Sequence, residues 1–388
     1  MTIDKTILIL GADGYLGWPT AMHFAKLGYK VIAVDNFAKR QWELEGGIEP
    51  LFPVSTLHKR VSLFKEITGY KITLEIGDLC NHRFVFKLFE NYKPDVVIHY
   101  AEQPSAPYSM KDRSSAYYTQ HNNVLGNLNV LFAMRHMHND CHLIKLGSMG
   151  EYGTPNIDIE EGYLEIEHKG RKDLLPFPMQ TNSFYHLSKV HDSNNIRFAT
   201  KLWGLRTTDL NQGVVYGVST PETELHPQLA TSFHYDEVFG TALNRFCTQA
   251  VVGHPLTLYG LGKQTKAMLN IVDTLQCVQL AVENPAEVGF MRVFNQFTES
   301  FTLTELAQTI KDEAEKMGYE PTIAYVDNPR TEDEDHYYNP VSTGLPELGL
   351  KPTLLAGDVL SNMLRKIDEH KDRVDTSVIR MNVKWKND

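Results

Sequence analysis

The chain has 388 residues, 42% of them hydrophobic and 22% charged, which allows a large buried core and excludes a disordered chain or a small disulfide scaffold. Its 38 basic and 48 acidic side chains give a net charge of −10, which disfavours a surface that binds the phosphates of nucleic acids. No apolar run approaches the roughly 18 residues of a membrane span, and no cleavable leader is recognisable. The four scattered cysteines match no metal site. We therefore expect a cytoplasmic protein without membrane insertion or a bound metal.

Short apolar runs alternate with amphipathic stretches through the first half of the chain. The runs are rich in β-branched and aliphatic residues, as strands buried in parallel sheets are, and they cover residues 6–10, 31–34, 72–76, 96–98 and 143–146. A further strand is expected at residues 206–212. The amphipathic stretches cover residues 19–27, 82–92 and 119–138. This order predicts an α/β fold with a doubly wound, Rossmann-type parallel sheet.

The second half of the chain is more mixed and has helical patterns near residues 237–252, 273–284, 302–317 and 354–370. We therefore expect a dinucleotide-binding domain over residues 1–212. A smaller substrate-binding domain would occupy most of residues 213–388 and be partly interleaved with the first.

Two insertions interrupt the alternation, at residues 36–70 and 155–182. The second insertion has the pattern of a hairpin, with Lys169 and Gly170 at its turn. Long segments inside compact domains are often lids or arms.

A glycine-rich segment follows the first predicted strand and opens the first predicted helix. It reads Gly11-Ala12-Asp13-Gly14-Tyr15-Leu16-Gly17. Glycines at such a turn let the backbone approach a ligand closely, and the start of the helix favours a diphosphate. We expect Gly11, Gly14, Tyr15, Leu16 and Gly17 to bind the cofactor.

Asp35 ends the second predicted strand, 18 residues after Gly17. A carboxylate there accepts hydrogen bonds from a ribose diol and repels a 2′-phosphate, which favours NAD over NADP. Arg40 could also approach the adenine ribose, which leaves this preference open. Asp78 follows the third strand and would suit the adenine amino group.

A tyrosine and a lysine stand four residues apart, at Tyr185 and Lys189, so on a helix they share one face. An ammonium beside a phenol lowers the phenol's pKa from about 10 and makes phenolate a usable base near neutrality. Ser148 follows the fifth predicted strand. Together with the Gly-x-x-Gly-x-x-Gly spacing, this set resembles the extended branch of the short-chain dehydrogenase/reductase superfamily.

The residues after Ser148 differ from those of related nucleotide-sugar 4,6-dehydratases, which carry an Asp-Glu acid/base pair there. This chain has Met149 and Gly150 instead. Glu151, one step further, either replaces the base or is only a strand-end carboxylate. His186 lies about 100° around the helix from Tyr185 and either faces the pocket as a proton carrier or packs as a core histidine.

Longer strings resemble the UDP-sulfoquinovose synthase family, and the resemblance runs from about residue 5 to residue 386, insertions included. The strings are His99–Met110, Tyr118–Val124, Leu146–Gly153, Ser183–Lys189, Asp209–Gly217, Phe239–Phe246 and His336–Asn339. The resemblance implies an NAD enzyme that makes UDP-sulfoquinovose from UDP-glucose and sulfite. The implied steps are oxidation at C4, loss of water across C5 and C6, sulfite addition at C6 and reduction at C4.

The resemblance also implies most of the expected ligand contacts. Further cofactor contacts are expected at Asn36, Arg40, Asp78, Leu79, Asn122, Tyr185, Lys189 and Gln212. Substrate contacts are expected at Gln103, Ser148, Asn211, Thr257, Tyr259, Gln264, Lys266 and Arg330, with Lys266 and Arg330 on the diphosphate. The expected catalytic residues are Ser148, Tyr185, Lys189, Glu151 and His186.

The chain departs from the family pattern at four positions. Ser148 stands where Thr is usual, and Pro104 replaces an Arg near the substrate. Lys266 replaces an Arg that binds diphosphate, which keeps the charge but loses the bidentate fork. Val214 occupies the position of an Asn in the broader superfamily, so Asn211 and Gln212 would supply its polar contacts.

Three other functions stay open at this point. A UDP-hexose 4-epimerase would use the same cofactor and the same Ser, Tyr and Lys, and a 4,6-dehydratase would need the missing Asp-Glu pair. A catalytically idle member of the superfamily that binds NAD or RNA is the most distant alternative.

The resemblance also bears on partners. The apolar pattern of residues 119–138 and the helix that carries Tyr185 resemble a pair of helices that forms dimers in extended family members, so we expect a homodimer. The sequence leaves open whether a partner protein donates the sulfite and whether the sulfosugar enters a lipid or a glycan.

Overall fold

A seven-stranded parallel sheet forms the centre of the protein. The computed structural model describes residues 3–137, 140–328, 336–379 and 385. The strand order is β12-β8-β5-β4-β1-β2-β3, and the predicted doubly wound fold is confirmed. The strands are β1 (Thr6–Leu10), β2 (Lys30–Asp35), β3 (Ile72–Ile76), β4 (Val96–His99), β5 (His142–Ser148), β8 (Arg206–Gln212) and β12 (Met291–Gln296).

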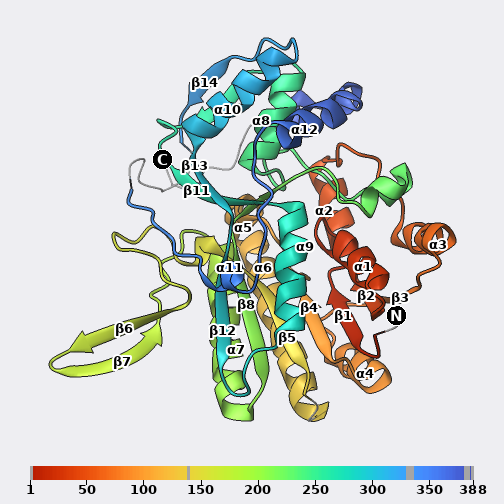
Figure 1. Ribbon diagram of the computed structural model, residues 1–388, viewed down its shortest axis with the longest axis vertical. Coiled ribbons are helices and arrows are strands. Elements are labelled where there is room, and N and C mark those ends of the chain that lie inside the picture. The colour runs from red at the N-terminus through yellow and green to blue at the C-terminus, as the bar shows by residue number, and fades with distance from the viewer. Residues whose placement is uncertain (1–2, 138–139, 329–335, 380–384, 386–388) are drawn as a thin grey trace.

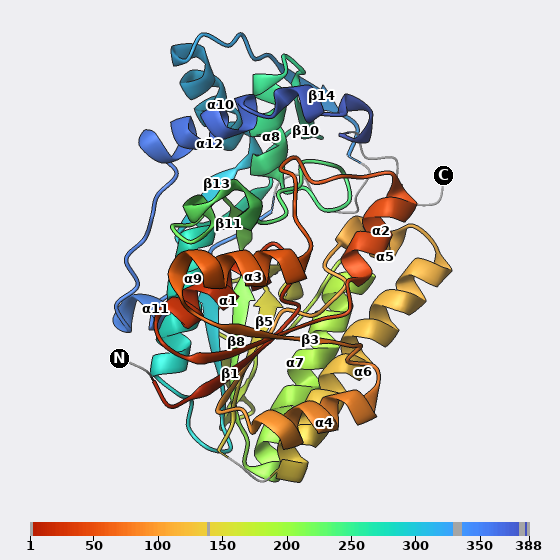
Figure 2. The same ribbon diagram turned by 90° about the vertical axis from the view of Figure 1, so that its right-hand side faces the viewer.

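Helices cover both faces of this sheet (Figures 1 and 2). Because side chains alternate along a strand, Ile7 and Ile9 of β1 pack on one face while Leu8 and Leu10 pack on the other. The first face is covered by α1 (Gly17–Lys26), α3 (Leu57–Thr68) and α9 (Ile271–Glu283). The second is covered by α4 (His82–Tyr92), α6 (Arg113–Met137) and α7 (Phe184–Trp203).

Strand β12 was not expected from the sequence. It comes from the second half of the chain and pairs with β8 over six residues at one edge of the sheet. Arg292 and Asn295 interrupt its apolar pattern. Arg292 donates to Thr208 of β8 at 3.0 Å, and Asn295 bonds to neighbouring loops. Its strand conformation therefore depends on contacts that are distant in sequence.

The first insertion forms two helices, α2 (Ala38–Gly46) and α3. Arg60 of α3 is fully buried, and its guanidinium lies 4.8 Å above the ring of Trp18 and forms an ion pair with Asp13. This ion pair attaches the insertion to the glycine-rich loop, since a buried guanidinium requires a charged partner.

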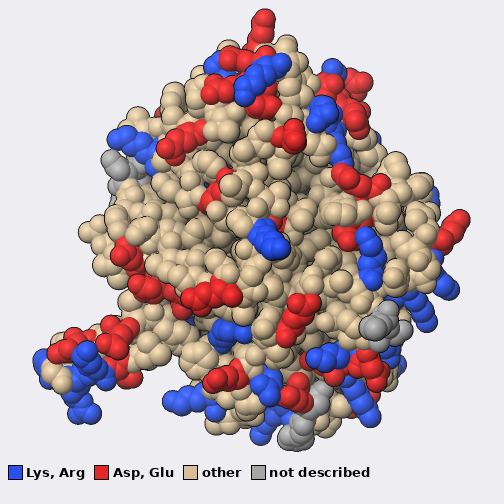
Figure 3. Space-filling view, viewed as in Figure 1, with Lys and Arg blue, Asp and Glu red and all other residues tan. Residues whose placement is uncertain are grey.

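The second insertion forms the predicted hairpin. Strands β6 (Tyr163–His168) and β7 (Arg171–Pro176) pair in antiparallel register, and both turn residues, Lys169 and Gly170, have positive φ. This is the geometry of a two-residue hairpin turn. The hairpin projects from the body and carries charges of both signs (Figures 1 and 3).

The rest of the second half packs around its own core. Helices α8 (Ala242–Val251), α10 (Leu303–Lys316) and α12 (Asp358–Asp368) bury Phe246, Ile310 and Leu364 there. The smaller sheets are β10 (Leu256–Tyr259) with β14 (Ile323–Val326), and β13 (Glu299–Thr302), β11 (Thr265–Asn270) and β9 (Val214–Tyr216). The short helices are α5 (Ala106–Met110) and α11 (Gly344–Glu347). Among the described residues, no helix combines the length and apolar character needed to cross a bilayer.

Candidate active site

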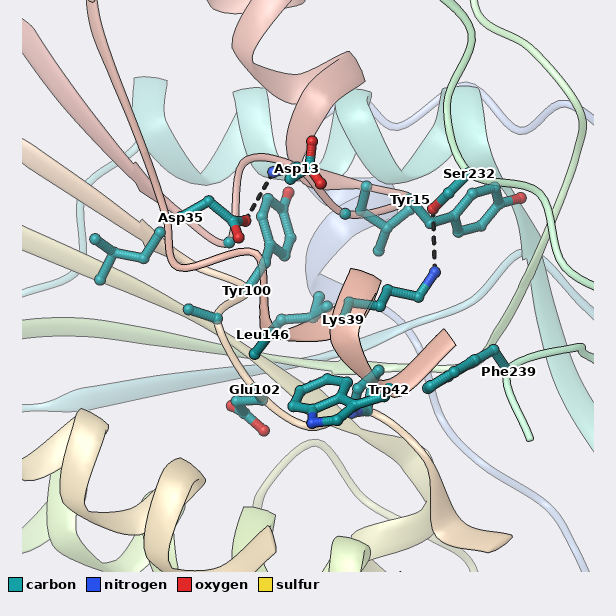
Figure 4. Close-up of a pocket in the computed structure, with 18 of the residues that line it drawn as sticks. Asp13, Tyr15, Asp35, Lys39, Trp42, Tyr100, Glu102, Leu146, Ser232 and Phe239 are labelled. Carbon is teal, nitrogen blue, oxygen red and sulfur yellow. Dashed lines mark hydrogen bonds between the residues drawn. The ribbon is translucent and has the colours of Figure 1, made fainter. Parts of the chain in front are cut away.

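The carboxyl edge of the main sheet opens into a cavity of about 380 Å³. It lies where the strand order reverses between β1 and β4, the place at which doubly wound sheets bind ligands. Its walls include the loop after β1, the ends of neighbouring strands, α2 and residues 231–241 (Figure 4). Twelve residues predicted for cofactor binding line it: Gly11, Gly14, Tyr15, Leu16, Gly17, Asp35, Asn36, Asp78, Leu79, Asn122, Tyr185 and Gln212.

The glycine-rich loop leaves no room for larger residues. Gly11 has a φ of +84°, and a Cβ there would lie 2.8 Å from the backbone nitrogen of Ala101. A Cβ on Gly17 would lie 2.0 Å from the carbonyl oxygen of Gly11. The start of α1 therefore comes close to the cavity, and the structure shows no side chain capping it. This arrangement fits a diphosphate, which the helix N-terminus attracts.

Asp35 lies at the end of β2 and faces the glycine-rich loop (Figure 4). Its Oδ2 accepts a hydrogen bond of 2.8 Å from the backbone nitrogen of Asp13, and its Oδ1 accepts one of 2.6 Å from Phe37. Burial raises the pKa of Asp35 to about 6, and the nearby Asp13 carboxylate also raises it. Asp35 keeps further lone pairs that can accept from ribose hydroxyls.

Arg40, for which a cofactor contact is predicted, does not line the cavity. Its Nε and Nη2 donate to the two carboxylate oxygens of Asp13 at 2.6 and 3.0 Å, and Nη2 also donates to the carbonyl of Ser55. The bidentate ion pair fixes the orientation of the guanidinium. In the structure Arg40 is a partner of Asp13, and its contact with the cofactor stays a prediction.

Helix α2 and residues 231–239 lie across the cavity from the sheet. Lys39 Nζ donates to Ser232 Oγ at 3.1 Å, and the ring of Trp42 stacks on that of Phe239 with 6.5 Å between centroids (Figure 4). His234 contacts Glu43 at 3.0 Å through Nε2 and Asp236 at 2.9 Å through Nδ1. The cavity is therefore covered by two segments that are far apart in sequence and are joined by polar and aromatic contacts.

Tyr185 lies in the first turn of α7, which Ser183 caps by accepting from the nitrogen of His186. Lys189 follows one turn later, with its Nζ 5.8 Å above the Tyr185 ring, 2.7 Å from Glu102 Oε2 and bonded to the carbonyl of Leu146. Burial raises the pKa of Tyr185, and Lys189 lowers it by less. Burial lowers the pKa of Lys189, but Glu102 and Tyr185 raise it above its ordinary value.

Ser148 ends β5, and its Oγ accepts a hydrogen bond of 3.1 Å from the nitrogen of Gly150 in the short 3₁₀ turn Met149–Glu151. Glu151 is the last residue of this turn and is fully buried. Its Oε1 accepts from the Ser148 nitrogen at 2.9 Å and from Lys145 at 3.3 Å, and its Oε2 accepts from Ser193 at 2.8 Å. Ser148, Glu151 and His186 do not line the cavity, and their catalytic roles stay predictions.

His186 occupies the space that Gly150 leaves free. A Cβ built on Gly150 would lie 2.3 Å from His186 Nε2. The imidazole Nδ1 lies 2.8 Å from Ser183 Oγ, and its ring centroid lies 4.8 Å from that of Tyr185. The imidazole of His186 therefore lies beside the phenol of Tyr185 and fills the space that a Cβ on residue 150 would need.

Gln103 and Asn211, two predicted substrate contacts, are fully buried and do not line the cavity. Gln103 accepts from the Ser105 nitrogen at 3.0 Å through its side chain, and its own nitrogen donates to Asn123 at 2.8 Å. Asn211 donates to the hydroxyl of Tyr152 at 2.6 Å. Both side chains take part in internal hydrogen bonds, and a role in substrate binding stays a prediction.

The other predicted substrate residues lie in the smaller part of the protein. Thr257 Oγ1 accepts from Gln249 at 2.9 Å, and Gln264 Nε2 donates to the carbonyl of Tyr259 at 3.4 Å. Lys266 is on β11, the next strand along the chain. Arg330 lies outside the described residues. The substrate contacts expected of all these residues stay predictions.

Sequence reasoning missed several buried charged residues beside the catalytic pair, among them Glu102, Lys145 and Asp192. Only Asp192 had a local signal, since it lies three residues after Lys189 and therefore on the same helical face. Glu102 follows β4, and the fold brings it into contact with Lys189 of α7, which is far away in the sequence. No local pattern announces such a contact.

Comparisons with known proteins agree with this arrangement. Residues 7–295 match the family model described as "NAD dependent epimerase/dehydratase family". The chloroplastic UDP-sulfoquinovose synthase of Spinacia oleracea is 54% identical over 98% of this chain and 79% of that protein. The UDP-sulfoquinovose synthase of Sulfolobus acidocaldarius is 41% identical over 98% of this chain and 97% of that protein.

A solved structure of low identity supports the fold. UDP-glucose 4-epimerase from Bifidobacterium longum, in complex with NAD+ and UDP, is 18% identical and has a TM-score of 0.68 over 95% of this chain and 98% of that one. The family match and the near-complete alignment to two synthases extend through both insertions. The chain therefore belongs to the NAD-dependent epimerase/dehydratase family and, within it, to the UDP-sulfoquinovose synthases.

Proposed function

We propose that this chain makes UDP-sulfoquinovose from UDP-glucose and sulfite. The observation that carries the proposal is the identity to two UDP-sulfoquinovose synthases over 98% of the chain. The site is compatible with it, because Tyr185 lines the cavity and Lys189 lies against its ring. UDP-glucose and sulfite would be the substrates, and water the second product.

The cavity fits NAD. The uncapped start of α1 would hold the diphosphate, Asp35 the adenine ribose, and Asp78 with Leu79 the adenine. Lys189 would contact the nicotinamide ribose. When bound, NAD accepts a hydride from C4 of the sugar and returns it at the end of the cycle.

Tyr185 would remove the proton of the 4-hydroxyl group while the hydride leaves C4, and Lys189 would stabilise the phenolate that does so. Ser148 would hydrogen-bond the same sugar oxygen from the end of β5. In the last step Tyr185 would return the proton when C4 is reduced. One side chain thus acts first as a base and later as an acid.

The steps at C5 and C6 require a second proton carrier. A 4-keto group acidifies the C5 proton, so that loss of the C6 hydroxyl leaves an alkene to which sulfite adds at C6. We assign this role to His186, whose imidazole lies beside the Tyr185 ring and next to Gly150. Glu151 accepts hydrogen bonds from Ser148 and Lys145, so it is better suited to position Ser148 than to touch the sugar.

Met149 is 5% exposed and packs with Tyr152 and Phe177, which gives this side of the turn an apolar lining.

The rivals differ at this turn. A 4,6-dehydratase would need the Asp-Glu pair that Met149 and Gly150 replace. A 4-epimerase needs no proton carrier for C6, and the space that Gly150 yields to His186 would then have no use in the reaction.

The first prediction tests the overall reaction. The purified protein with UDP-glucose and sulfite should form a product in which a sulfonate replaces one hydroxyl group, as detected by mass spectrometry. Tyr185→Phe keeps the ring but removes the base, so turnover should fall at least ~10²-fold while UDP-glucose still binds. UDP-galactose as the main product would instead indicate a 4-epimerase.

The second prediction concerns Asp35 and pH. Ionised Asp35 accepts hydrogen bonds from ribose hydroxyls, and its pKa before binding is about 6, so it is protonated below that pH and ionised above it. NAD affinity should therefore be constant near neutral pH and fall as the pH drops through 6, by up to ~10-fold per pH unit. Calorimetric titration measures this. In Asp35→Asn the affinity should be weaker and its pH dependence lost; an Asn variant that keeps the parental dependence would assign the titration to another group.

The third prediction tests the pairing of Gly150 with His186. Gly150→Ala adds a methyl group that displaces the imidazole, so NADH absorbance should still appear with UDP-glucose while sulfosugar formation falls at least ~10-fold. In a His186→Ala background the same substitution should add no further loss, because the displaced ring is absent. Parental product formation by Gly150→Ala would contradict the role of His186.

We further infer a homodimer formed through α6 and α7. Large apolar side chains are exposed at helical spacing on both helices, and such patches mark protein interfaces. They are Tyr117, Leu125 and Phe132 of α6 and Phe198 and Leu202 of α7. A second copy that places its own α6 and α7 on this face would bury them by two-fold symmetry.

The fourth prediction tests this face. The parent should have a dimer mass by light scattering at micromolar concentration, and Phe198→Glu should shift it to monomer, because a buried carboxylate opposes the interface. Ile67→Glu changes a residue of similar type on α3 that is also exposed, and it should leave the dimer intact. A monomeric parent would contradict the inference.

A further inference from the structure

The Lys189 ammonium has two candidate counter-charges, and only one of them is Tyr185. Glu102 Oε2 lies 2.7 Å from Lys189 Nζ, and both side chains are almost fully buried, at 2% and 3% exposure. Glu102 also lines the cavity (Figure 4). A phenolate at Tyr185 would therefore share its cation with a carboxylate that is already in contact with it.

The neighbouring charges form a separate set. Lys145 is buried between Glu151 at 3.3 Å and Asp209 at 3.5 Å, and Ser193 Oγ lies within hydrogen-bond distance of both carboxylates, at 2.8 and 2.6 Å. Lys145 is thus already matched by two acids. Within the described part of the chain, Glu102 is the acid that forms an ion pair with Lys189.

Asp192 is the remaining acid of this region. It is fully buried, and neither of its carboxyl oxygens has a hydrogen-bond partner among the described residues. Burial raises the pKa of Asp192 well above its ordinary value, and the charge on Glu102 adds to this. Among the described residues Asp192 forms no ion pair with Lys189, whereas Glu102 lies 2.7 Å from it, so Glu102 is the acid in direct contact with the ammonium.

A cation shared between two anions stabilises each of them less than it would stabilise one alone. Loss of the Glu102 charge would leave Lys189 to Tyr185, whose phenolate would then form at lower pH. The shared arrangement has a chemical use, because Tyr185 must also return its proton when C4 is reduced. A phenol that is too acidic would be a poor donor in that last step.

We propose that Glu102 is a positioning residue that competes with Tyr185 for the Lys189 ammonium and so sets the pH range in which Tyr185 acts as the base. The proposal rests on the function proposed above, in which Tyr185 is the base at the 4-hydroxyl group. It assigns to Glu102 no contact with the reacting atoms.

The test is the pH profile of C4 oxidation, followed as NADH absorbance in a single turnover with UDP-glucose and without sulfite. In Glu102→Gln the midpoint of the profile should move to lower pH by about one unit or more. Asp192→Asn is the matched control, because it removes a buried carboxyl group of the same region that forms no ion pair with Lys189 among the described residues, and its midpoint should match that of the parent. An unchanged or upward-shifted midpoint in Glu102→Gln would overturn the proposal, as would an equal shift in Asp192→Asn.

A second measurement does not depend on turnover. The ultraviolet difference spectrum of the holoenzyme between acid and alkaline pH, minus that of Tyr185→Phe, reports the tyrosinate of Tyr185. Its midpoint should shift in the same direction in Glu102→Gln. If that variant does not fold, Glu102→Asp should give a smaller downward shift, because the shorter side chain draws its charge away from Lys189; an unmoved midpoint would refute the proposal.

The outcome for Tyr185→Phe separates the two proposals. If Tyr185→Phe oxidises C4 at the parental rate, the base assignment fails and the role of Glu102 fails with it. If Tyr185→Phe is inactive while Glu102→Gln keeps the parental profile, the proposed function stands and only the role of Glu102 is refuted.

Discussion

The arrangement of the cofactor side of the molecule depends on how the carboxylate of Asp13 is neutralised. This residue lies within the glycine-rich loop, where a diphosphate has to approach, and it is only 8% exposed. Alone it would repel that ligand. Arg40 and Arg60, both from the first insertion, form ion pairs with it, so the three side chains together carry one positive charge. The insertion is thereby attached to the loop that it helps to make attractive to phosphate.

The sheet and the cofactor loop could be predicted because both depend on local patterns. Continuous apolar runs specify buried parallel strands, and the glycine spacing specifies a turn into which no Cβ fits, as Gly11 and Gly17 demonstrate. The pairing of Tyr185 with Lys189 followed from helical periodicity in the same way. Strand β12 could not be predicted, because the polar side chains of Arg292 and Asn295 find their partners, Thr208 and Val341, elsewhere in the chain.

The direction of polar side chains was harder to predict than the position of the backbone. Asn211 and Glu151 lie on or beside the expected strands, yet the first is directed toward Tyr152 and the second toward Lys145. A polar residue near a site satisfies whichever partner is closest after packing, and sequence spacing does not identify that partner. For the same reason the ion pair between Glu102 and Lys189 was visible only in three dimensions.

The covering of the cavity by α2 and residues 231–239 has a consequence for the lifetime of the complex. A dinucleotide behind this cover can leave on that side only if Lys39 parts from Ser232, Trp42 from Phe239 and Glu43 from His234. Because these contacts join separate segments, they have to open together, and dissociation becomes slow compared with a local side-chain motion. A redox partner that is restored within each cycle has no need to exchange with the solvent. We therefore expect that the concentration of dinucleotide in the surroundings does not limit the rate, and that the dinucleotide behaves as a prosthetic group.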